Sequence, residues 1–162
     1  MIRLRSATVA DAPRCAAIYA PFVNDSWVSF ELVAPDSAEM ASRMARALQS
    51  HDWLVAERDG TILGYAYGSE HRTRAAYRTS CDVAVYVDPQ WNRQGIGRSL
   101  YEALLPRLEA RKMHAAFAGI ALPNEASIAL HRATGFDLVG TYREVGWKRG
   151  GWRDVAWFQR LL

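Results

Sequence analysis

Between an expected strand and an expected helix, the chain reads Asn92-Arg93-Gln94-Gly95-Ile96-Gly97-Arg98. The strand ends at Val87, and the helix runs from 99 to 112. A glycine-rich turn at such a junction lets the backbone approach an anion, and it aims the first N–H groups of the helix at that anion. The natural guest is a phosphate or a pyrophosphate. A plain tight connection is the commoner meaning of a lone Gly-x-Gly, so the surrounding sequence has to decide.

The composition is that of a globular protein. Half of the 162 residues are hydrophobic and 23% are charged, and neither a repeat nor a low-complexity linker divides them. No apolar run approaches the roughly 20 residues of a membrane span. Met1 to Arg5 are not followed by the apolar core of a signal peptide. We therefore expect a single domain over residues 1–162, in the cytoplasm, with no membrane partner.

Charge and cysteine content argue against two other classes of protein. The net charge of +3 is modest and is not gathered into a basic tail, so nucleic acid is not an expected partner. Cys15 and Cys81 stand alone, without the spacing of a metal or redox site. We expect them to be free buried thiols, and we expect no metal.

Turn signals and apolar periods predict elements in the order β-α-α-β-β-β-α-β-α-β-β, a mixed α/β (α+β) domain on a mainly antiparallel sheet. The strands cover 2–6, 53–58, 61–68, 80–87, 115–122, 136–147 and 152–161, and the helices 11–24, 37–49, 99–112 and 124–135. The clearest signal is the hairpin at Asp59-Gly60, a pair that favours a type I′ turn. Ser37 and Asn124 are the expected N-caps of the second and last helices.

Side-chain periodicity separates a buried face from an open face next to the glycine loop. Along the strand before the loop, one face carries Cys81, Val83, Val85 and Val87, and the other carries Asp82, Ala84 and Tyr86. In the helix after the loop, a buried stripe four residues apart is expected at Ile96, Leu100, Leu104 and Leu108. Pro106 should kink or loosen this helix.

Two segments of the chain, the glycine loop and a later run that begins at Asn124, resemble motifs of a known family. The run from Asn124 to Phe136 resembles the N-x-x-S-x-x-L-[Y/H]-x-x-x-G-[F/Y] segment of the GNAT N-acetyltransferase superfamily, and the glycine loop resembles its pyrophosphate loop. Within that superfamily the chain looks most like the phosphinothricin (methionine sulfoximine) acetyltransferases, over residues 3–160. The residues that carry this likeness are Arg72-x-Arg74-x-x-Tyr77, Val85-Tyr86-Val87, Leu122-Pro123-Asn124, Leu130-His131 and Gly146-x-Lys148-x-Gly150-Gly151-Trp152-x-Asp154-Val155.

The resemblance implies a GNAT fold, acetyl-CoA as co-substrate, and acetyl transfer to the α-amino group of a small amino-acid analogue by a homodimeric enzyme. Residues implied at the acetyl-CoA site are Val85, Tyr86 and Val87 for the pantetheine arm, Arg93, Gln94, Gly95, Ile96, Gly97 and Arg98 for the pyrophosphate, and Asn124 for the CoA arm. Arg72 and Arg74 would bind the acidic ends of the acceptor. Its pocket would be shaped by Phe30, Tyr77, Ala84, Tyr86 and Val155.

Two side chains are candidates for proton transfer. An α-amine is mostly protonated at neutral pH, and a carboxylate can take that proton directly or through water. Asp82 lies on the open strand face, and it is one methylene shorter than the glutamate of the related enzymes, which favours a water relay. His131 stands where many members of the superfamily have a tyrosine that protonates the leaving thiolate. Either residue could instead serve only in packing or orientation.

Other functions remain open at this stage. The same acetyl-CoA site could serve a protein N-terminus or another amine, although Arg72 and Arg74 would repel a cationic acceptor. A non-catalytic acyl-CoA sensor is a further alternative, because two residues depart from the family pattern. Asp82 stands in place of the glutamate, and Asn92 stands in place of the usual glutamine or arginine at the first position of the loop. A dinucleotide-binding enzyme is not indicated, since the loop lacks the G-x-G-x-x-G form.

Overall fold

The structure, a computed structural model, describes residues 1–162 and is built on one sheet of seven strands in the order β1-β2-β3-β4-β5-β7-β6. The strands are β1 (Arg3–Ser6), β2 (Trp53–Arg58), β3 (Thr61–Glu70), β4 (Ser80–Val87), β5 (Ala115–Ala121), β6 (Asp137–Lys148) and β7 (Gly151–Leu161). The helices are α1 (Ala12–Asn24), α2 (Ser37–Ser50), α3 (Ile96–Ala110) and α4 (Glu125–Ala133). Element order and fold class agree with the prediction from sequence.

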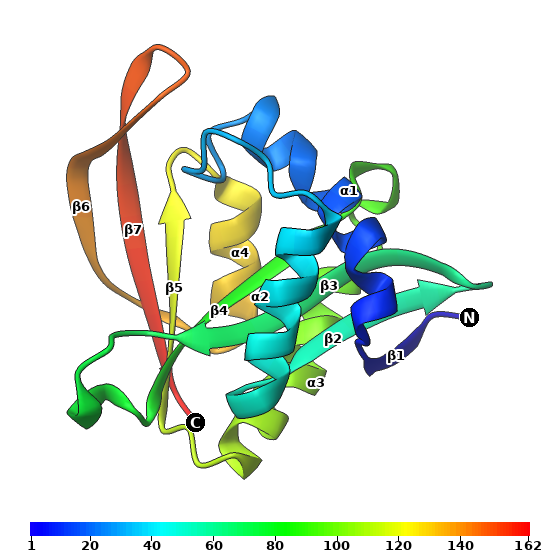
Figure 1. The fold of residues 1–162 in the computed structure, drawn as a ribbon. Helices are drawn as coiled ribbons and strands as arrows, with labels where there is room; N and C mark the ends of the chain where they lie inside the picture. The colour runs from blue at the N-terminus through cyan, green and yellow to red at the C-terminus, as the bar shows by residue number, and fades with distance from the viewer.

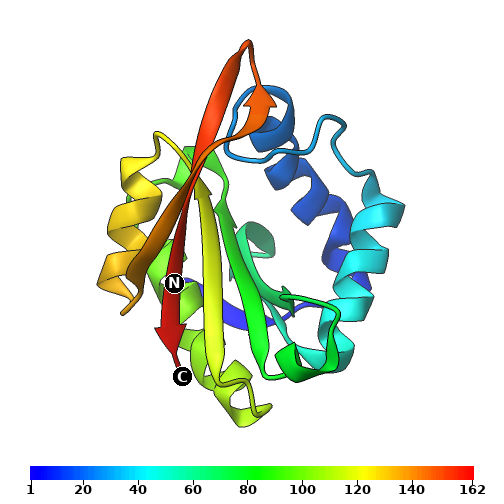
Figure 2. The same cartoon turned by 90° about the vertical axis from the view of Figure 1, so that its left-hand side faces the viewer.

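Helices cover both faces of the sheet, as Figures 1 and 2 show: α1 and α2 lie on one face and α3 and α4 on the other. Each face has its own hydrophobic core. One core gathers side chains of α3 and β5 around Leu100 and Leu104, and the other gathers side chains of α1 and α2 around Met44 and Trp53. None of the four α-helices is both long and apolar enough to cross a membrane.

Local signals in the first half of the chain are largely confirmed. Asp59 (φ 50°) and Gly60 (φ 77°) both have positive φ between the antiparallel strands β2 and β3, as a type I′ turn requires. The expected cap at Ser37 was wrong by one residue. Asp36 is the N-cap of α2, and its carboxylate accepts a hydrogen bond from the N–H of Glu39 at 2.8 Å. Aspartate satisfies this position as well as serine does.

The opening that matters for function lies between β4 and β5. This is the one parallel pair of the sheet, and its register covers only Ser80, Cys81 and Asp82 of β4, paired with 115–117 of β5. Beyond Asp82 the two strands continue without pairing, and Figure 1 shows them diverging. The sheet therefore splits at Asp82, which leaves two free backbone edges facing each other.

Helix α3 begins at Ile96, three residues before the predicted start, and ends at Ala110, two residues before the predicted end, while its buried stripe is confirmed. Ile96, Leu100, Leu104 and Leu108 are all buried to 2% exposure or less. Pro106 lies within the helix without ending it, since α3 continues to Ala110. The buried stripe fixes the start of α3, and with it the glycine loop, against the end of β4.

The β6–β7 hairpin stands apart from the rest of the molecule. It extends beyond the helices in Figures 1 and 2, and β6 forms one edge of the sheet. Its pairing is interrupted between Tyr142 and Gly146, where Glu144 has a positive φ of 51°. Apolar side chains of this hairpin are at least half exposed, namely Leu138, Val139, Tyr142, Val145, Trp147 and Trp152.

Candidate active site

The glycine loop offers a row of unused backbone donors. Gly95 has φ 75° and is the N-cap residue of α3, so the chain turns sharply into the helix. None of the N–H groups from Arg93 to Arg98 donates a hydrogen bond within the chain. These groups, together with the positive end of the α3 dipole, are suited to an anionic pyrophosphate. The side chains of Arg93, Gln94 and Arg98 are exposed around them.

The free edge of β4 leads from this loop into the opening of the sheet. A narrow space of about 60 Å³ lies there, between Val83–Tyr86 of β4 and Ala118–Ala121 of β5. Asn124 and Ser127 border it from α4. The side-chain oxygen of Asn124 accepts the N–H of Ser127 at 3.2 Å, which leaves its amide NH₂ free to donate. An amide-containing chain such as pantetheine can pair with a free strand edge of this kind.

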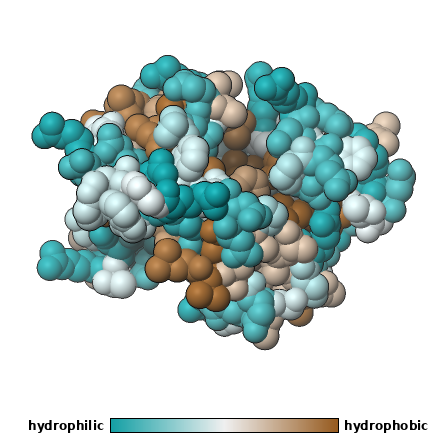
Figure 3. Space-filling view, turned by 90° about the horizontal axis from the view of Figure 1, so that it is seen from above, coloured by the Kyte–Doolittle hydropathy of each residue, from teal (hydrophilic) through white to brown (hydrophobic).

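A wider cavity of about 510 Å³ adjoins this space on the side of α1 and α2. The face of the molecule at the end of β5 is hollowed, with apolar side chains in the depth of the hollow (Figure 3). Of the residues predicted to contact the acceptor, the cavity brings together Phe30, Ala84, Tyr86 and Val155, with Asp82 beside them. Tyr86 is held by edge contact with Tyr19, at 4.9 Å between ring centroids.

Asp82 is the carboxylate at the point where the sheet splits. Its side chain is 34% exposed, and its Oδ1 lies 2.6 Å from Nδ1 of His71. Burial raises the pKa of the Asp82 carboxyl, while the hydrogen bond with His71 and the nearby charge of Arg72 act in the opposite direction. A carboxylate with a raised pKa inside a cavity is suited to accept a proton near neutral pH.

A second carboxylate, Glu31, borders the same cavity. Arg43 of α2 binds both of its oxygens, at 2.6 and 2.9 Å, and holds the pKa of the Glu31 carboxyl below its usual range. Lys148, only 6% exposed, secures this segment from β6 by donating to the carbonyl groups of Val23, Ser29 and Glu31. The wall of the cavity is thus fixed by charged groups from three elements.

His131 borders the narrow space with a ring that is almost fully buried. The ring is 4% exposed, and its Nδ1 lies 2.7 Å from the carbonyl oxygen of Ser127. Because that oxygen can only accept, Nδ1 carries the proton and Nε2 accepts from the hydroxyl of Tyr101 at 3.0 Å. Burial lowers the pKa of His131, which keeps the ring neutral. Tyr101 borders the same narrow space, so its hydroxyl and the His131 ring lie together at the edge of that space.

Three residues predicted to contact the acceptor lie outside the 510 Å³ cavity. Arg72 is exposed and lines a neighbouring cavity of about 320 Å³, together with His71 and Trp157. Tyr77 is 42% exposed and lines a cavity beside α2. Arg74 is exposed as well and does not line the Asp82 cavity. Within one chain, the expected arginine pair is thus near the site but not in it.

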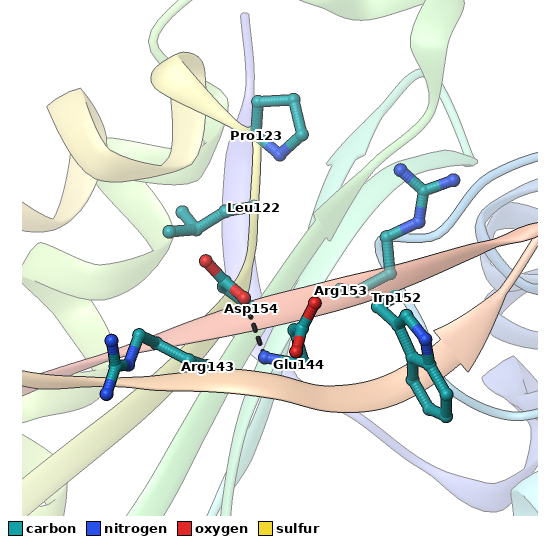
Figure 4. A pocket seen from close by; sticks show the side chains of 7 residues that line it. All are labelled: Leu122, Pro123, Arg143, Glu144, Trp152, Arg153 and Asp154. Carbon is teal, nitrogen blue, oxygen red and sulfur yellow. Dashed lines mark hydrogen bonds between the residues drawn. The ribbon is translucent and has the colours of Figure 1, made fainter.

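A larger cavity of about 980 Å³ lies between the β6–β7 hairpin and the turn after β5. Figure 4 shows Glu144 and Asp154 close together there, with the carboxylate of Asp154 accepting the N–H of Glu144 at 2.7 Å. Arg143 and Arg153 lie at its two ends. The cavity includes no residue of β4 or of the glycine loop, so it is separate from the two spaces that β4 lines. No group of three or more His, Cys, Asp or Glu side chains is arranged to hold a metal ion.

Comparison with known proteins gives the family. The model of the acetyltransferase (GNAT) family matches residues 19–136. The chain belongs to this family. It is an acetyl-CoA-dependent N-acetyltransferase, and the expectations for the fold, the enzyme class and the co-substrate are confirmed.

Individual relatives agree with the group predicted from sequence. A phosphinothricin N-acetyltransferase of Alcaligenes faecalis is 42% identical over 94% of this chain and 78% of its own length. The crystal structure of a phosphinothricin acetyltransferase from Sinorhizobium meliloti in complex with acetyl-CoA is 36% identical, with a TM-score of 0.95, 99% of this chain covered and 88% of that one. A structure named as ribosomal-protein-alanine N-acetyltransferase from Brucella melitensis is 37% identical, with a TM-score of 0.94 and 99% of both chains covered.

Sequence reasoning missed three residues that shape the site: His71, Glu31 and Lys148. His71 stands beside the predicted arginines, but nothing local showed that its ring would bond Asp82 across a loop. Glu31 and Lys148 are joined through backbone and side-chain contacts over more than one hundred residues of sequence. The one available signal was the position of Lys148 within the family-like C-terminal segment.

Proposed function

We propose that this enzyme transfers the acetyl group to the α-amino group of a small amino-acid analogue of the phosphinothricin or methionine sulfoximine type. The observation that carries the proposal is the carboxylate of Asp82, which lines the 510 Å³ cavity at the point where β4 and β5 part. The donor loop lies at the far end of β4. An amine in the cavity is therefore next to both a base and the strand edge expected to hold the acetyl donor.

The residues support a direct transfer. Asp82 takes a proton from the acceptor ammonium group, and the freed amine attacks the thioester carbonyl, a use of general base catalysis worth about 10²- to 10⁴-fold. Backbone N–H groups of β4 near Val85 stabilise the oxyanion. His131, acting through the hydroxyl of Tyr101, is the proton source on the side of the leaving thiolate.

In this proposal, different residues contact the different parts of acetyl-CoA. Val85, Tyr86 and Val87 supply the strand edge for pantetheine, Arg93 to Arg98 supply donors for the pyrophosphate, and Asn124 supplies its free amide NH₂. The unused N–H groups of the loop support this assignment, because such donors are satisfied by an anion.

Charge supports an amino-acid acceptor. Glu31 and Asp82 are the two charged groups of the cavity, and they favour an ammonium group over an anion. The anionic ends of the acceptor then point toward the exposed side, where Arg72 and Arg74 lie. Phe30, Tyr77, Ala84, Tyr86 and Val155 provide the remaining contacts in this proposal, with Tyr77 and Arg74 at the rim. The chain acts as one domain, in keeping with a sheet that takes strands from Arg3 to Leu161.

A protein N-terminus is the second candidate acceptor. It is favoured by the likeness to the Brucella melitensis structure named for acetylating ribosomal-protein alanine. The cavity of about 510 Å³ has room for one residue of a peptide, and the hollow is open to the surface. Acceptors without a free carboxylate therefore belong in any test.

The discriminating experiment is thiol release from acetyl-CoA with a panel of acceptors. We expect the highest kcat/KM with phosphinothricin, methionine sulfoximine or methionine sulfone, and much less with an alanine-initiated peptide. The reverse order would favour a protein N-terminus. Binding of acetyl-CoA with no acetylated product from any acceptor would favour the sensor. Expression of the chain in bacteria should also confer resistance to phosphinothricin if the proposal is right.

We also propose a homodimer that works in the cytoplasm. The half-exposed apolar side chains on β6 and β7, Val139, Val145 and Trp147 among them, are more than an isolated edge strand usually shows to water. The free buried thiols of Cys15 and Cys81 suit a reducing compartment. Sedimentation equilibrium should give twice the monomer mass for the unmodified protein. The double variant Val145→Lys with Trp147→Lys should give the mass of one monomer.

A further inference from the structure

His71 contacts the proposed base from outside the acceptor cavity. It follows the last residue of β3, and the register of β3 with β4 pairs Ser69 with Asp82. Its Nδ1 lies 2.6 Å from Oδ1 of Asp82, a short distance for a bond to a carboxylate. No other side-chain hydrogen bond to Asp82 is present within the chain.

Three aromatic rings fix the orientation of the His71 ring. It is stacked on Phe117 at 4.4 Å between centroids with an interplanar angle of 18°. The rings of Tyr77 and Trp157 approach it edge-on, at 5.8 and 6.4 Å. A ring packed in this way keeps Nδ1 aimed at Asp82, and it leaves Nε2 without a partner in the chain.

The pair joins two cavities. Asp82 lines the acceptor cavity, whereas His71 lines the separate 320 Å³ cavity beside β6. Trp157 lines both and stands between them. With Oδ1 bound to His71, Oδ2 is the oxygen of Asp82 left for the acceptor amine.

We propose that His71 is a positioning residue for Asp82, one that fixes the carboxylate so that Oδ2 accepts the proton of the acceptor amine. The inference rests on the proposed acetyl transfer. An N–H bond of the acceptor ammonium breaks, and its proton moves to Oδ2 while the nitrogen keeps the electron pair. That pair forms the bond to the acetyl carbon, and the carbon–sulfur bond breaks with its electrons going to the leaving thiolate. The second proton that the nitrogen loses on becoming an amide goes to this thiolate, which leaves as the thiol. The proton held by the Asp82–His71 pair returns to water before the next turnover.

Other titratable groups face the pair from the loop after β3, from β3 and β4, and from the far side of the cavity. The loop after β3 supplies Arg72, whose charge favours ionised Asp82, and Tyr77, which contacts His71. Strand β3 supplies Tyr67, whose pKa burial raises to about 12, so its hydroxyl stays neutral at pH 7. Cys81 is adjacent on β4 and has its pKa raised to about 12 by burial. Glu31 lines the far side of the cavity and is paired with Arg43. None of these competes with His71 as a donor to Asp82.

Two substitutions separate the hydrogen bond from the packing. His71→Phe keeps the stacked ring and removes the donor, and His71→Asn keeps a donor close to the Nδ1 position and removes the ring. Because the bond favours the ionised carboxylate, its loss in His71→Phe should raise the pKa of Asp82 and shift the acidic limb of the kcat profile upward by about one pH unit. We expect kcat to fall about tenfold, the size of one charge-assisted hydrogen bond, with the Kd for acetyl-CoA unchanged.

The kcat of the asparagine variant shows whether the hydrogen bond of His71 to Asp82 or the packing of the His71 ring is what matters. His71→Asn should keep kcat within about threefold of the unmodified enzyme, a smaller loss than the tenfold of a missing charge-assisted bond. An equal loss of kcat in both variants would overturn the proposal. The proposal would also be overturned if His71→Phe kept the kcat of the unmodified enzyme and an unshifted acidic limb of the pH profile. His114→Asn, an exposed histidine elsewhere, is the control and should change neither quantity.

A titration without turnover keeps this test separate from that of the proposed function. The ¹³C shift of the Asp82 carboxyl, followed by NMR in selectively labelled protein, should give a higher pKa in His71→Phe than in the unmodified enzyme. An unchanged pKa would refute the role of His71 even if acetyl transfer is observed. Absence of transfer with every acceptor would refute the proposed function, while the titration would still decide the pairing.

Discussion

The hydroxyl of Tyr101 lies 3.0 Å from Nε2 of His131, and both buried side chains border the narrow space between β4 and β5. Since Nδ1 of His131 donates to the carbonyl of Ser127, the ring cannot donate to Tyr101, and the hydroxyl must be the donor. The pair therefore holds one proton between a hydroxyl oxygen and an imidazole nitrogen, and both residues border the narrow space between β4 and β5.

Tyr101→Phe should lower kcat more than it lowers the affinity for acetyl-CoA. The variant keeps the aromatic ring but removes the hydroxyl that donates to His131 at the narrow space between β4 and β5. We expect kcat to fall at least about tenfold, a loss at the low end for general acid catalysis. It also leaves a buried imidazole nitrogen unpaired, at a cost of about 1–3 kcal/mol in the free energy of unfolding. Steady-state kinetics and urea unfolding measure the two effects.

Tyr65→Phe is the matched control for this change. Tyr65 is 1% exposed and belongs to the core on the opposite face of the sheet. Its loss of a hydroxyl should leave kcat unchanged. If Tyr101→Phe retained full kcat, the hydroxyl of Tyr101 would have no part in proton transfer.

Gly95→Ala should weaken acetyl-CoA binding through the shape of the loop. Gly95 has φ 75°, and an added Cβ would meet no atom of the chain within 4 Å. The methyl group would stand in open space at the loop that an anion has to approach closely. We expect the Kd for acetyl-CoA, measured by calorimetry, to rise about tenfold.

Gly60→Ala is the matched control, because it introduces the same backbone strain at a turn away from the glycine loop. Gly60 has φ 77° and equally open surroundings in the β2–β3 turn. Both variants should lose about 1 kcal/mol of stability, the cost of the left-handed conformation for an L-residue. Equal Kd values for the two would show that the loop does not bind the donor.

Gly146→Ala should disturb the acceptor side alone. An added Cβ would lie 2.8 Å from Cζ of Phe30, so the ring has to move out of the cavity wall. We expect the KM for the acceptor to rise severalfold while the KM for acetyl-CoA stays constant. Gly140→Ala, where the added Cβ meets nothing within 4 Å, is the control on the same strand. A similar effect of both substitutions would exclude Phe30 as the cause.

Asp82→Asn should gain stability as it loses activity, and the gain should depend on pH. The pKa of Asp82 is raised in the folded protein, so between the unfolded and folded values the native state binds more protons than the unfolded state. Stability of the unmodified enzyme therefore falls as pH rises through that window, and the asparagine variant lacks this loss. The difference in Tm should be largest above the folded pKa and should shrink toward pH 4. A Tm difference that is constant with pH would contradict the raised pKa.

Local patterns in the sequence predicted the elements that position the site. The Asp59-Gly60 turn, the alternation along β4 and the buried stripe of α3 each depend on residues within a few positions of one another. Long-range pairings were beyond such reasoning. Lys148 reaches the carbonyl of Ser29 across 119 residues, and His71 meets Asp82 only because β3 and β4 bring their ends together. Arg74 and Tyr77 were placed in the acceptor pocket by resemblance, and a loop conformation that sequence does not reveal puts them outside the cavity of one chain.

Acetyl transfer to an amino-acid analogue, with Asp82 as the base, is open to a single decisive experiment. The direct test is mass-spectrometric detection of N-acetylphosphinothricin together with thiol release, for the unmodified enzyme and for Asp82→Asn. We expect one thiol per acetylated product, and a turnover about 10²- to 10⁴-fold lower in the variant with the Kd for acetyl-CoA retained. No product from an enzyme that binds acetyl-CoA, or full turnover by Asp82→Asn, would contradict it.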